Sequence, residues 1–276
     1  MLLLAVSAVA AVRTGSVKAR DGVRIVYDVR GSGPTTLLFV HCWSCDRSFW
    51  RNQVDVFADR YQVVTLDLAG HGESGRDRKT WTVLGLADDV RAVADELKLQ
   101  RIILVGHSMG GPVSLEAARL LKGRVIGVIP VDTLQNAEMR IPLQAIQPIV
   151  DKLKADFPGT MSGFMGGMFA PGSDPAARQY VETKARAADP AVAMALMLDF
   201  ATVDFAKLFT AAGVPIRGIN AKRPPGEDTN FAGNRKYADF DAAIMDNVGH
   251  FIQLERPREF NEQLAKFAAS LSAAAR

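Results

Sequence analysis

A serine between two glycines is the clearest chemical signal in the sequence. Residues 106–110 read Gly-His-Ser-Met-Gly, which fits the pattern G-x-S-x-G, and they follow an apolar run and precede a helical pattern. On a sharp strand-to-helix turn the serine backbone is strained, and the glycines remove side chains that would collide there. The hydroxyl then projects beyond the sheet at a helix N-terminus, where the field favours a developing anion. The pattern predicts that Ser108 is a nucleophile.

A serine nucleophile needs a general base, and the chain contains four histidines. His107 adjoins the serine in the turn, so we expect its side chain to point away from the hydroxyl. His41 ends an early predicted strand, and His71 lies in a glycine-rich loop. His250 follows the last predicted strand, and catalytic groups of a parallel sheet gather at the carboxyl ends of its strands. We therefore predict that His250 is the base.

The elements that position these residues follow an alternating strand and helix pattern. Residues 23–29 alternate apolar and polar side chains and predict an antiparallel strand pair at the start. Continuous apolar runs, which suit parallel strands buried on both faces, occupy 36–40, 61–66, 101–105 and 125–131. Helical spacing occupies 48–58, 82–97 and 112–121 between them, and strand character returns at 215–219 and 240–245, before a last helix over 257–269. The order predicts an α/β fold with a mostly parallel central sheet flanked by helices.

The stretch 134–213 interrupts this rhythm. It has helical patterns without a convincing strand, and its prolines predict about four short helices. We expect an α/β core over 13–133 and 214–276, an all-helical insertion over 134–213 and a separate apolar segment over 1–12. A stripe of methionine and phenylalanine side chains in the insertion suits either core packing or an apolar acyl pocket, and it comprises Met161, Phe164, Met165, Met168 and Phe169.

Four motifs in chain order resemble those of the α/β-hydrolase fold superfamily. Besides 106–110, residues 39–43 resemble its oxyanion loop, 67–74 resemble the loop that precedes the serine-turn unit, and 248–251 resemble its catalytic histidine loop. The likeness extends over nearly the whole chain after Thr14 and is to capped serine esterases and lipases. It implies an α/β-hydrolase fold in which the helical insertion is a cap.

The resemblance also implies an oxyanion hole formed by the backbone N–H groups of Trp43 and Met109. Two such donors, aimed at the developing oxyanion, lower the barrier by several kcal/mol. Cys42 stands where glycine is usual in this loop, so its side chain either narrows the site or changes the loop backbone.

The acid of the triad has two candidate positions. Asp132 closes the apolar run 125–131, and some members of the superfamily place the acid there. The more usual place is the loop after 215–219, where a lysine stands near the expected position and Asp228 comes several residues late. We favour Asp132 as the acid, with Asp228 or another carboxylate as the alternative. If Asp132 is not the acid, we expect it to cap a helix.

These residues together predict a serine carboxylesterase that acts by two-step acyl transfer on a small to medium acyl chain. Serine in the turn argues against dehalogenases and epoxide hydrolases of the superfamily, which place a carboxylate there. Lactone, thioester or C–C bond hydrolysis and perhydrolysis use the same serine framework and stay open. So do a slow-turnover ligand receptor and an inactive scaffold.

Composition limits the partners. The net charge is +3 and the basic residues are scattered, so we expect a small-molecule ester substrate and no nucleic acid partner. The stretch 70–75 matches G-x-G-x-x-G, but a charged run delays the next helix and no acidic strand end follows, so we expect no cofactor. No motif indicates a metal site. The oligomeric state stays open.

Neither the N-terminal segment nor the two cysteines decide where the protein is located. The segment 1–12 is too short to span a bilayer and has no basic residue before it, so it is either a truncated export signal or an apolar extension, in a cytoplasmic or exported protein. The two cysteines, Cys42 and Cys45, allow no disulfide framework. We expect two buried thiols there, with a local disulfide in an exported protein and a thioredoxin-type redox pair as alternatives.

Overall fold

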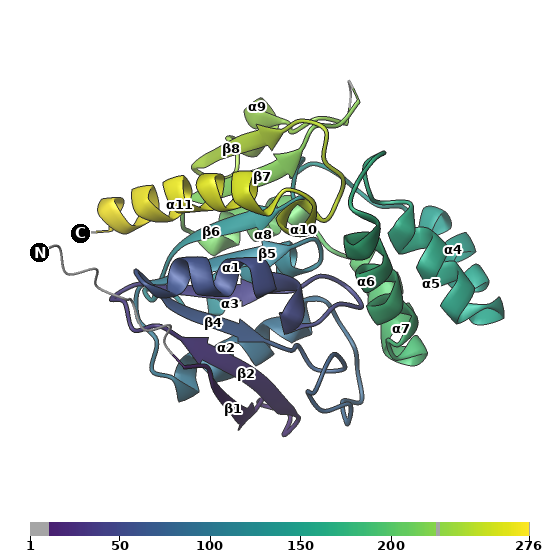
Figure 1. Cartoon of the computed structure of the whole chain (residues 1–276), viewed down its shortest axis with the longest axis horizontal. Coiled ribbons are helices and arrows are strands. Elements are labelled where there is room, and N and C mark those ends of the chain that lie inside the picture. The colour runs from purple at the N-terminus through teal and green to yellow at the C-terminus, as the bar shows by residue number, and fades with distance from the viewer. Residues whose placement is uncertain (1–10, 225–226, 276) are drawn as a thin grey trace, which may run out of the picture.

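An eight-stranded mixed sheet forms the centre of the computed structural model, which describes residues 11–224 and 227–275. The strand order is β1-β2-β4-β3-β5-β6-β7-β8 (Figure 1). The strands are β1 (Arg13–Lys18), β2 (Arg24–Arg30), β3 (Thr36–Val40), β4 (Gln62–Leu66), β5 (Ile102–His107), β6 (Val125–Val131), β7 (Ile216–Ala221) and β8 (Phe240–Met245). The β1–β2 and β2–β4 pairs are antiparallel and the other pairs are parallel. The predicted fold class is confirmed.

The central strands are apolar throughout because helices cover both faces of the sheet. In β3, Leu37 and Phe39 belong to one buried cluster and Leu38 and Val40 to the other, as alternating side chains require. The first cluster includes side chains of α1 (Arg51–Ala58), α10 (Ile252–Glu255) and α11 (Pro257–Ala274). The second includes side chains of α2 (Ala87–Glu96), α3 (Gly110–Leu120) and α8 (Phe205–Ala212). The sheet is therefore the middle of three layers.

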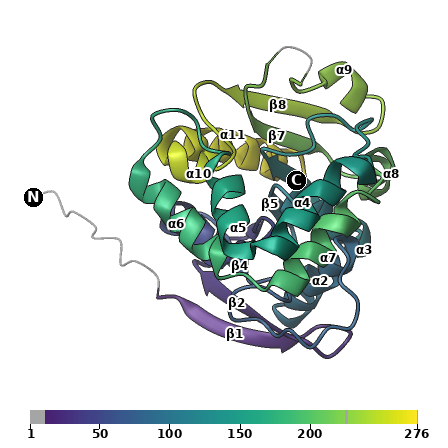
Figure 2. The same cartoon turned by 90° about the vertical axis from the view of Figure 1, so that its right-hand side faces the viewer.

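Four helices gather at one end of the sheet, where Figures 1 and 2 show them beside one another. They are α4 (Leu143–Ala155), α5 (Phe157–Gly166), α6 (Pro175–Arg186) and α7 (Pro190–Phe200). Three of them begin with an aspartate whose carboxylate accepts a backbone N–H of the first turn, followed by proline in that turn, and these caps are Asp156, Asp174 and Asp189. Local sequence therefore sets where these helices begin.

Several predicted boundaries differ from the structure. The stretch 134–213 has five described helices where about four were predicted. Pro148 lies inside α4 and does not end it, and the fifth helix, α8, packs against α3 beside the sheet. Pro148 is the sixth residue of α4, where its missing N–H leaves one carbonyl without a helical donor, and the helix continues through it. The helix predicted over 48–58 is a 3₁₀ turn, Arg47–Trp50, followed by α1, and another 3₁₀ turn, Leu84–Leu86, precedes α2. A short α9 (Phe231–Asn234) precedes β8.

The apolar N-terminal segment predicted over 1–12 lies outside the described residues except for 11 and 12. Among the described helices, none has the length and hydropathy that crossing a bilayer requires.

Candidate active site

Ser108 lies in a strained turn between β5 and α3. Its φ is +53°, in the left-handed region that side chains disfavour, and its N–H donates to the Val131 carbonyl at 3.0 Å. A side chain at Gly106 would collide with the Gly110 carbonyl, and one at Gly110 would collide with the Val40 carbonyl. The two glycines of the motif are therefore required by close backbone approach, as the sequence pattern predicts.

His250 and Asp132 come together from distant parts of the chain. Asp132 follows β6 and His250 follows β8, and the histidine Nδ1 lies 2.6 Å from the Asp132 Oδ2. Asp132 is buried, with φ of +45°, and its Oδ1 accepts the Ala221 N–H at 2.9 Å. Asp228, the alternative, instead accepts the backbone N–H of Arg223 at 3.1 Å. In the described part of the chain, the carboxylate in contact with His250 is thus Asp132.

A guanidinium, which the sequence did not predict, shares the Asp132 carboxylate with His250. Arg223, in the loop after β7, forms an ion pair with the same Oδ2 atom that contacts the imidazole. Burial raises the pKa of the Asp132 carboxyl, but the His250 hydrogen bond, the His250 and Arg223 charges and the Ala221 N–H outweigh it, so the pKa is lowered. Asp132 therefore remains ionised at neutral pH. The basic pair 222–223, where a carboxylate is usual, is the signal that could have indicated this arrangement.

Glu255 holds the loop that carries His250. Its carboxylate accepts the N–H groups of Gly249 and Phe251, on either side of the histidine, each at 3.1 Å. It also accepts the Ala170 N–H at 3.1 Å, and the His250 N–H donates to the Met168 carbonyl at 2.8 Å. The histidine loop is thus tied to the segment that follows α5. No local motif distinguishes Glu255, so its role was not predicted.

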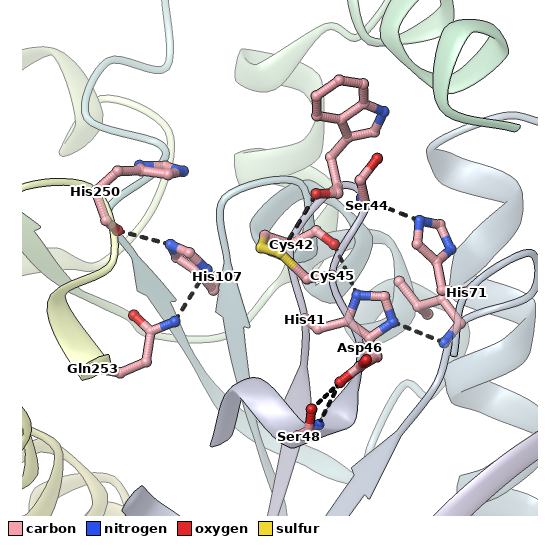
Figure 3. Close-up of a disulfide and its surroundings, with 12 residues drawn as sticks. His41, Cys42, Ser44, Cys45, Asp46, Ser48, His71, His107, His250 and Gln253 are labelled. Atoms are coloured by element: carbon pink, nitrogen blue, oxygen red, sulfur yellow. Dashed lines mark hydrogen bonds between the residues drawn. A yellow bond between two sulfur atoms is a disulfide. The ribbon is translucent and has the colours of Figure 1, made fainter. Parts of the chain in front are cut away.

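The other three histidines are buried and occupied by structural hydrogen bonds. His107 donates from Nε2 to the His250 carbonyl at 2.8 Å and accepts at Nδ1 from Gln253 at 3.2 Å, so both of its ring nitrogens are engaged with the loop and helix that follow β8 (Figure 3). His41 and His71 each accept a backbone N–H at Nε2, from Leu68 and Ser44. Burial lowers their pKa values to about 4 for His41 and about 3 for His71 and His107. All three are therefore neutral imidazoles at neutral pH.

Cys42 and Cys45 form a disulfide, so the expectation of two thiols is wrong (Figure 3). A tight turn, in which the Cys45 N–H donates to the Cys42 carbonyl at 3.2 Å, brings the two side chains together. Both side chains are buried. The spacing allowed this alternative, but only the turn geometry distinguishes a bond from two thiols.

Trp43 and Met109, whose backbone N–H groups are the predicted oxyanion donors, line the same cavity as the serine. The cavity has a volume of about 200 Å³, and its wall includes Trp43, Ser108, Met109 and His250. Among the hydrogen bonds of the described residues, the backbone N–H groups of Trp43 and Met109 donate to no protein acceptor. Two amides without a protein acceptor, in the cavity that also contains a serine hydroxyl, are what an oxyanion requires.

The rest of the cavity wall is apolar. It is made of Cys42 and Phe251 together with side chains of α4, α5 and α7 and the segments beside them: Ile141, Ile146, Ile149, Phe164, Met165, Met168, Leu196, Met197 and Phe200. From the predicted methionine and phenylalanine stripe, Phe164, Met165 and Met168 line the cavity, whereas Met161 and Phe169 are buried in the core. The stripe therefore contributes to both core and cavity.

A larger hollow of about 630 Å³ contains neither the serine nor His250. Its wall carries Arg47, which forms ion pairs with Asp28, Asp67 and Glu73. Asp67 also accepts the Glu73 N–H at 2.8 Å, so these charges brace the loop 67–74. We take the smaller cavity as the candidate active site because it contains the strained serine and the histidine–carboxylate pair.

Comparison with known proteins gives three kinds of likeness. A family model described as "Alpha/beta hydrolase family" matches residues 37–263. The dihydrolipoyllysine-residue acetyltransferase component of the acetoin cleaving system of Cupriavidus necator is 39% identical over 108 residues, which are 39% of this chain and 29% of that protein. The match thus spans less than a third of that curated relative.

Two solved structures have similar folds over most of both chains. A thermophilic esterase from Thermogutta terrifontis superposes with a TM-score of 0.81 at 22% identity, covering 94% of this chain and 99% of the esterase. Est816, described as an N-acyl homoserine lactone degrading enzyme, superposes with a TM-score of 0.76 at 25% identity, covering 92% and 100%. The first likeness is one of fold alone.

Proposed function

The chain belongs to the alpha/beta hydrolase family, and we propose that it is a serine hydrolase that cleaves carboxylic esters of small to medium acyl chain. The observation that carries this proposal is the strained Ser108 in one cavity wall with His250, whose Nδ1 is bound to the buried Asp132. The helical group α4–α7 is proposed as the cap of residues 134–213, because side chains of α4, α5 and α7 line the same cavity as the serine.

His250 acts as the general base in the proposed first step. Asp132 accepts a hydrogen bond from the His250 Nδ1–H, which leaves the Nε2 lone pair to take the proton of the Ser108 hydroxyl. The serine oxygen then attacks the ester carbonyl, and the imidazolium formed is stabilised by the Asp132 carboxylate. His250 returns the proton to the leaving alcohol, which departs and leaves an acyl-enzyme. Water, activated by the same imidazole, hydrolyses this intermediate.

The Trp43 and Met109 amides stabilise the oxyanion of both steps. Their N–H groups have no acceptor among the described residues, so they lose no protein hydrogen bond when they bind the developing charge. In a cavity walled mostly by apolar side chains, such donors are stronger than in water. The removal of one oxyanion donor typically lowers kcat by about 10²- to 10³-fold.

The cavity supports an apolar acyl group as the recognised part of the substrate. Its volume, about 200 Å³, is below the roughly 300–1,000 Å³ of sites for drug-sized ligands. Beyond the catalytic groups, its side chains supply no hydrogen-bonding partner except the Trp43 indole, which already donates to the Ala193 carbonyl at 2.9 Å. A polar acyl group would therefore lose its hydration without compensation.

A lactone is the second candidate substrate, favoured by the likeness to Est816 over nearly the whole chain. A lactone carbonyl undergoes the same attack, but its leaving alcohol stays tethered to the acyl-enzyme. Parallel assays with acyl homoserine lactones and p-nitrophenyl esters of equal acyl length separate the two candidates.

The testing experiment compares wild type with Ser108→Ala on p-nitrophenyl acetate, butyrate and octanoate. We expect wild-type turnover that falls at least about 10³-fold in the variant, and stoichiometric fluorophosphonate labelling of the wild type alone. Equal rates in the two folded proteins would overturn the nucleophile assignment. Labelling with negligible turnover on every ester and lactone would instead support a ligand receptor, and failure of both tests would indicate an inactive scaffold.

A further inference from the structure

The Cys42–Cys45 disulfide closes a ring of four residues around Trp43, whose amide is a proposed oxyanion donor. We propose that this bond positions the Trp43 N–H, so that reduction of the disulfide lowers kcat but leaves substrate binding in the cavity largely unchanged. This inference rests on the serine hydrolase mechanism proposed above. It assigns a function to the cysteine that stands where the superfamily usually has glycine.

Hydrogen bonds fix the plane of the Cys42–Trp43 peptide. The Cys42 carbonyl accepts the His41 Nδ1–H at 2.8 Å and the Cys45 N–H at 3.2 Å. His41 has its proton on Nδ1 because its Nε2 accepts the Leu68 N–H at 3.0 Å. In a trans peptide the N–H points opposite to the carbonyl. Because two donors hold the Cys42 oxygen, the Trp43 N–H points in the opposite direction, away from His41 Nδ1 and the Cys45 N–H.

The direction of this N–H decides whether the oxyanion hole is formed. Cys42 and Trp43 line the cavity together with Ser108, and the Trp43 N–H has no acceptor among the described residues. A rotation of the peptide plane would replace the donor with the Cys42 carbonyl, which repels an oxyanion. Catalysis thus depends on a peptide orientation that a flexible loop would not maintain.

The disulfide stabilises the tight turn that this orientation requires. Ser44, inside the ring, has φ of +57°, which costs a residue with a side chain about 1–3 kcal/mol, and its N–H donates to His71 Nε2 at 3.3 Å. Figure 3 shows the sulfur–sulfur bond between the segment of His41 and Ser44 on one side and His107 on the other. A ring of only four residues constrains the unfolded chain less than a long loop does. Its effect therefore lies mainly in local geometry.

Each cysteine of the disulfide lines a cavity, although both side chains are buried. Cys42 lines the cavity that contains Ser108, and Cys45 lines a neighbouring hollow of about 180 Å³. A small dithiol reduces the disulfide by forming a mixed disulfide with one sulfur and then closing on itself. Two electrons and two protons pass to Cys42 and Cys45, which become thiols, and the dithiol leaves as a cyclic disulfide. The reaction therefore balances with the dithiol as the only added reagent.

The experiment measures kcat and KM for p-nitrophenyl butyrate with oxidised and dithiothreitol-treated wild type and with Cys45→Ala. Cys45 is the better position to change because, unlike Cys42, it is not part of the wall of the substrate cavity. Alkylation and mass spectrometry count the free thiols in each sample. Loss of a whole oxyanion donor sets the upper limit of the effect, so we expect kcat to fall about 10- to 100-fold, with KM changed less than about 3-fold.

Cys45→Ala should match the reduced wild type in kcat and in its rate of fluorophosphonate labelling, and should not respond to dithiothreitol. If the thermal midpoint of Cys45→Ala changes little while its kcat falls, the disulfide acts by positioning the Trp43 N–H and not by stabilising the whole protein. Two free thiols in the oxidised protein, or full kcat in folded Cys45→Ala, would overturn the inference. If the wild type resists reduction, the variant decides alone. If the oxidised wild type neither hydrolyses the ester nor reacts with the fluorophosphonate, the serine hydrolase mechanism itself would be refuted.

Discussion

Replacement of Asp132 by asparagine tests the triad at its most specific contact. Asp132 Oδ1 accepts the Ala221 N–H, and Oδ2 accepts both the His250 Nδ1–H and the Arg223 guanidinium. Asparagine has one oxygen and one NH₂ group. If its oxygen faces Ala221, the NH₂ faces two donors, and if the side chain flips, the NH₂ faces the backbone N–H. The structure therefore permits no arrangement of the amide that satisfies all three donors.

The first arrangement also reverses the imidazole tautomer. His250 would then accept at Nδ1 and carry its proton on Nε2, which could no longer take the Ser108 proton. A neutral amide in a serine triad lowers kcat about 10⁴-fold, which corresponds to about 5.4 kcal/mol of barrier. We expect a loss of about 10³- to 10⁴-fold for Asp132→Asn, together with about 1–3 kcal/mol of stability from the unsatisfied groups.

The assay compares Asp132→Asn with Asp228→Asn, using p-nitrophenyl butyrate between pH 5 and 9 and urea unfolding to confirm that each variant folds. Asp228 contacts the Arg223 backbone in the same loop, so its variant controls for disturbance of Arg223. We expect Asp228→Asn to keep kcat within about 3-fold, since that change removes no contact with the imidazole. Near wild-type activity in Asp132→Asn, or a larger loss in Asp228→Asn, would refute the assignment of Asp132.

Further predictions concern acid stability, the serine turn and the acyl cavity. The three histidines outside the proposed triad have pKa values lowered to about 3 to 4, so the unfolded chain takes up their protons first as pH falls below 6.5, and stability present above that pH is lost. Urea unfolding should show a loss of up to roughly 6 kcal/mol between pH 7 and pH 5, and equal midpoints would contradict this. Gly106→Ala should destabilise the turn by about 1–3 kcal/mol or more, because the methyl group meets the backbone of α3, whereas Gly163→Ala in open space on α5 should leave the thermal midpoint unchanged or raised. Phe164→Ala should enlarge the cavity and shift the ester preference towards octanoate in kcat/KM, and an unchanged chain-length profile would show that the acyl group lies elsewhere.

Local sequence was sufficient for most of the strands and for the serine turn. The runs 36–40 and 125–131 coincide with central strands of the structure, since strands buried on both faces must be continuously apolar. The stretch 240–245 coincides with β8, a partly exposed strand at the edge of the sheet. The turn at Ser108 was equally predictable, because the steric demand for glycine on both sides operates within five residues. The position of His250 in a loop after the last strand followed from chain order.

Only the tertiary structure decided which groups meet across the strand ends. Asp132 and Asp228 both lie in loops after strands, and the paths of those loops place Asp132 beside His250 and bring Arg223 to the same carboxylate oxygen. The disulfide likewise depends on a tight turn that spacing alone leaves open. Residue types and periodicity report the environment of each segment, whereas a hydrogen bond requires two segments to meet within about 3 Å. That distance is set by the packing of the whole core, so no local pattern encodes it.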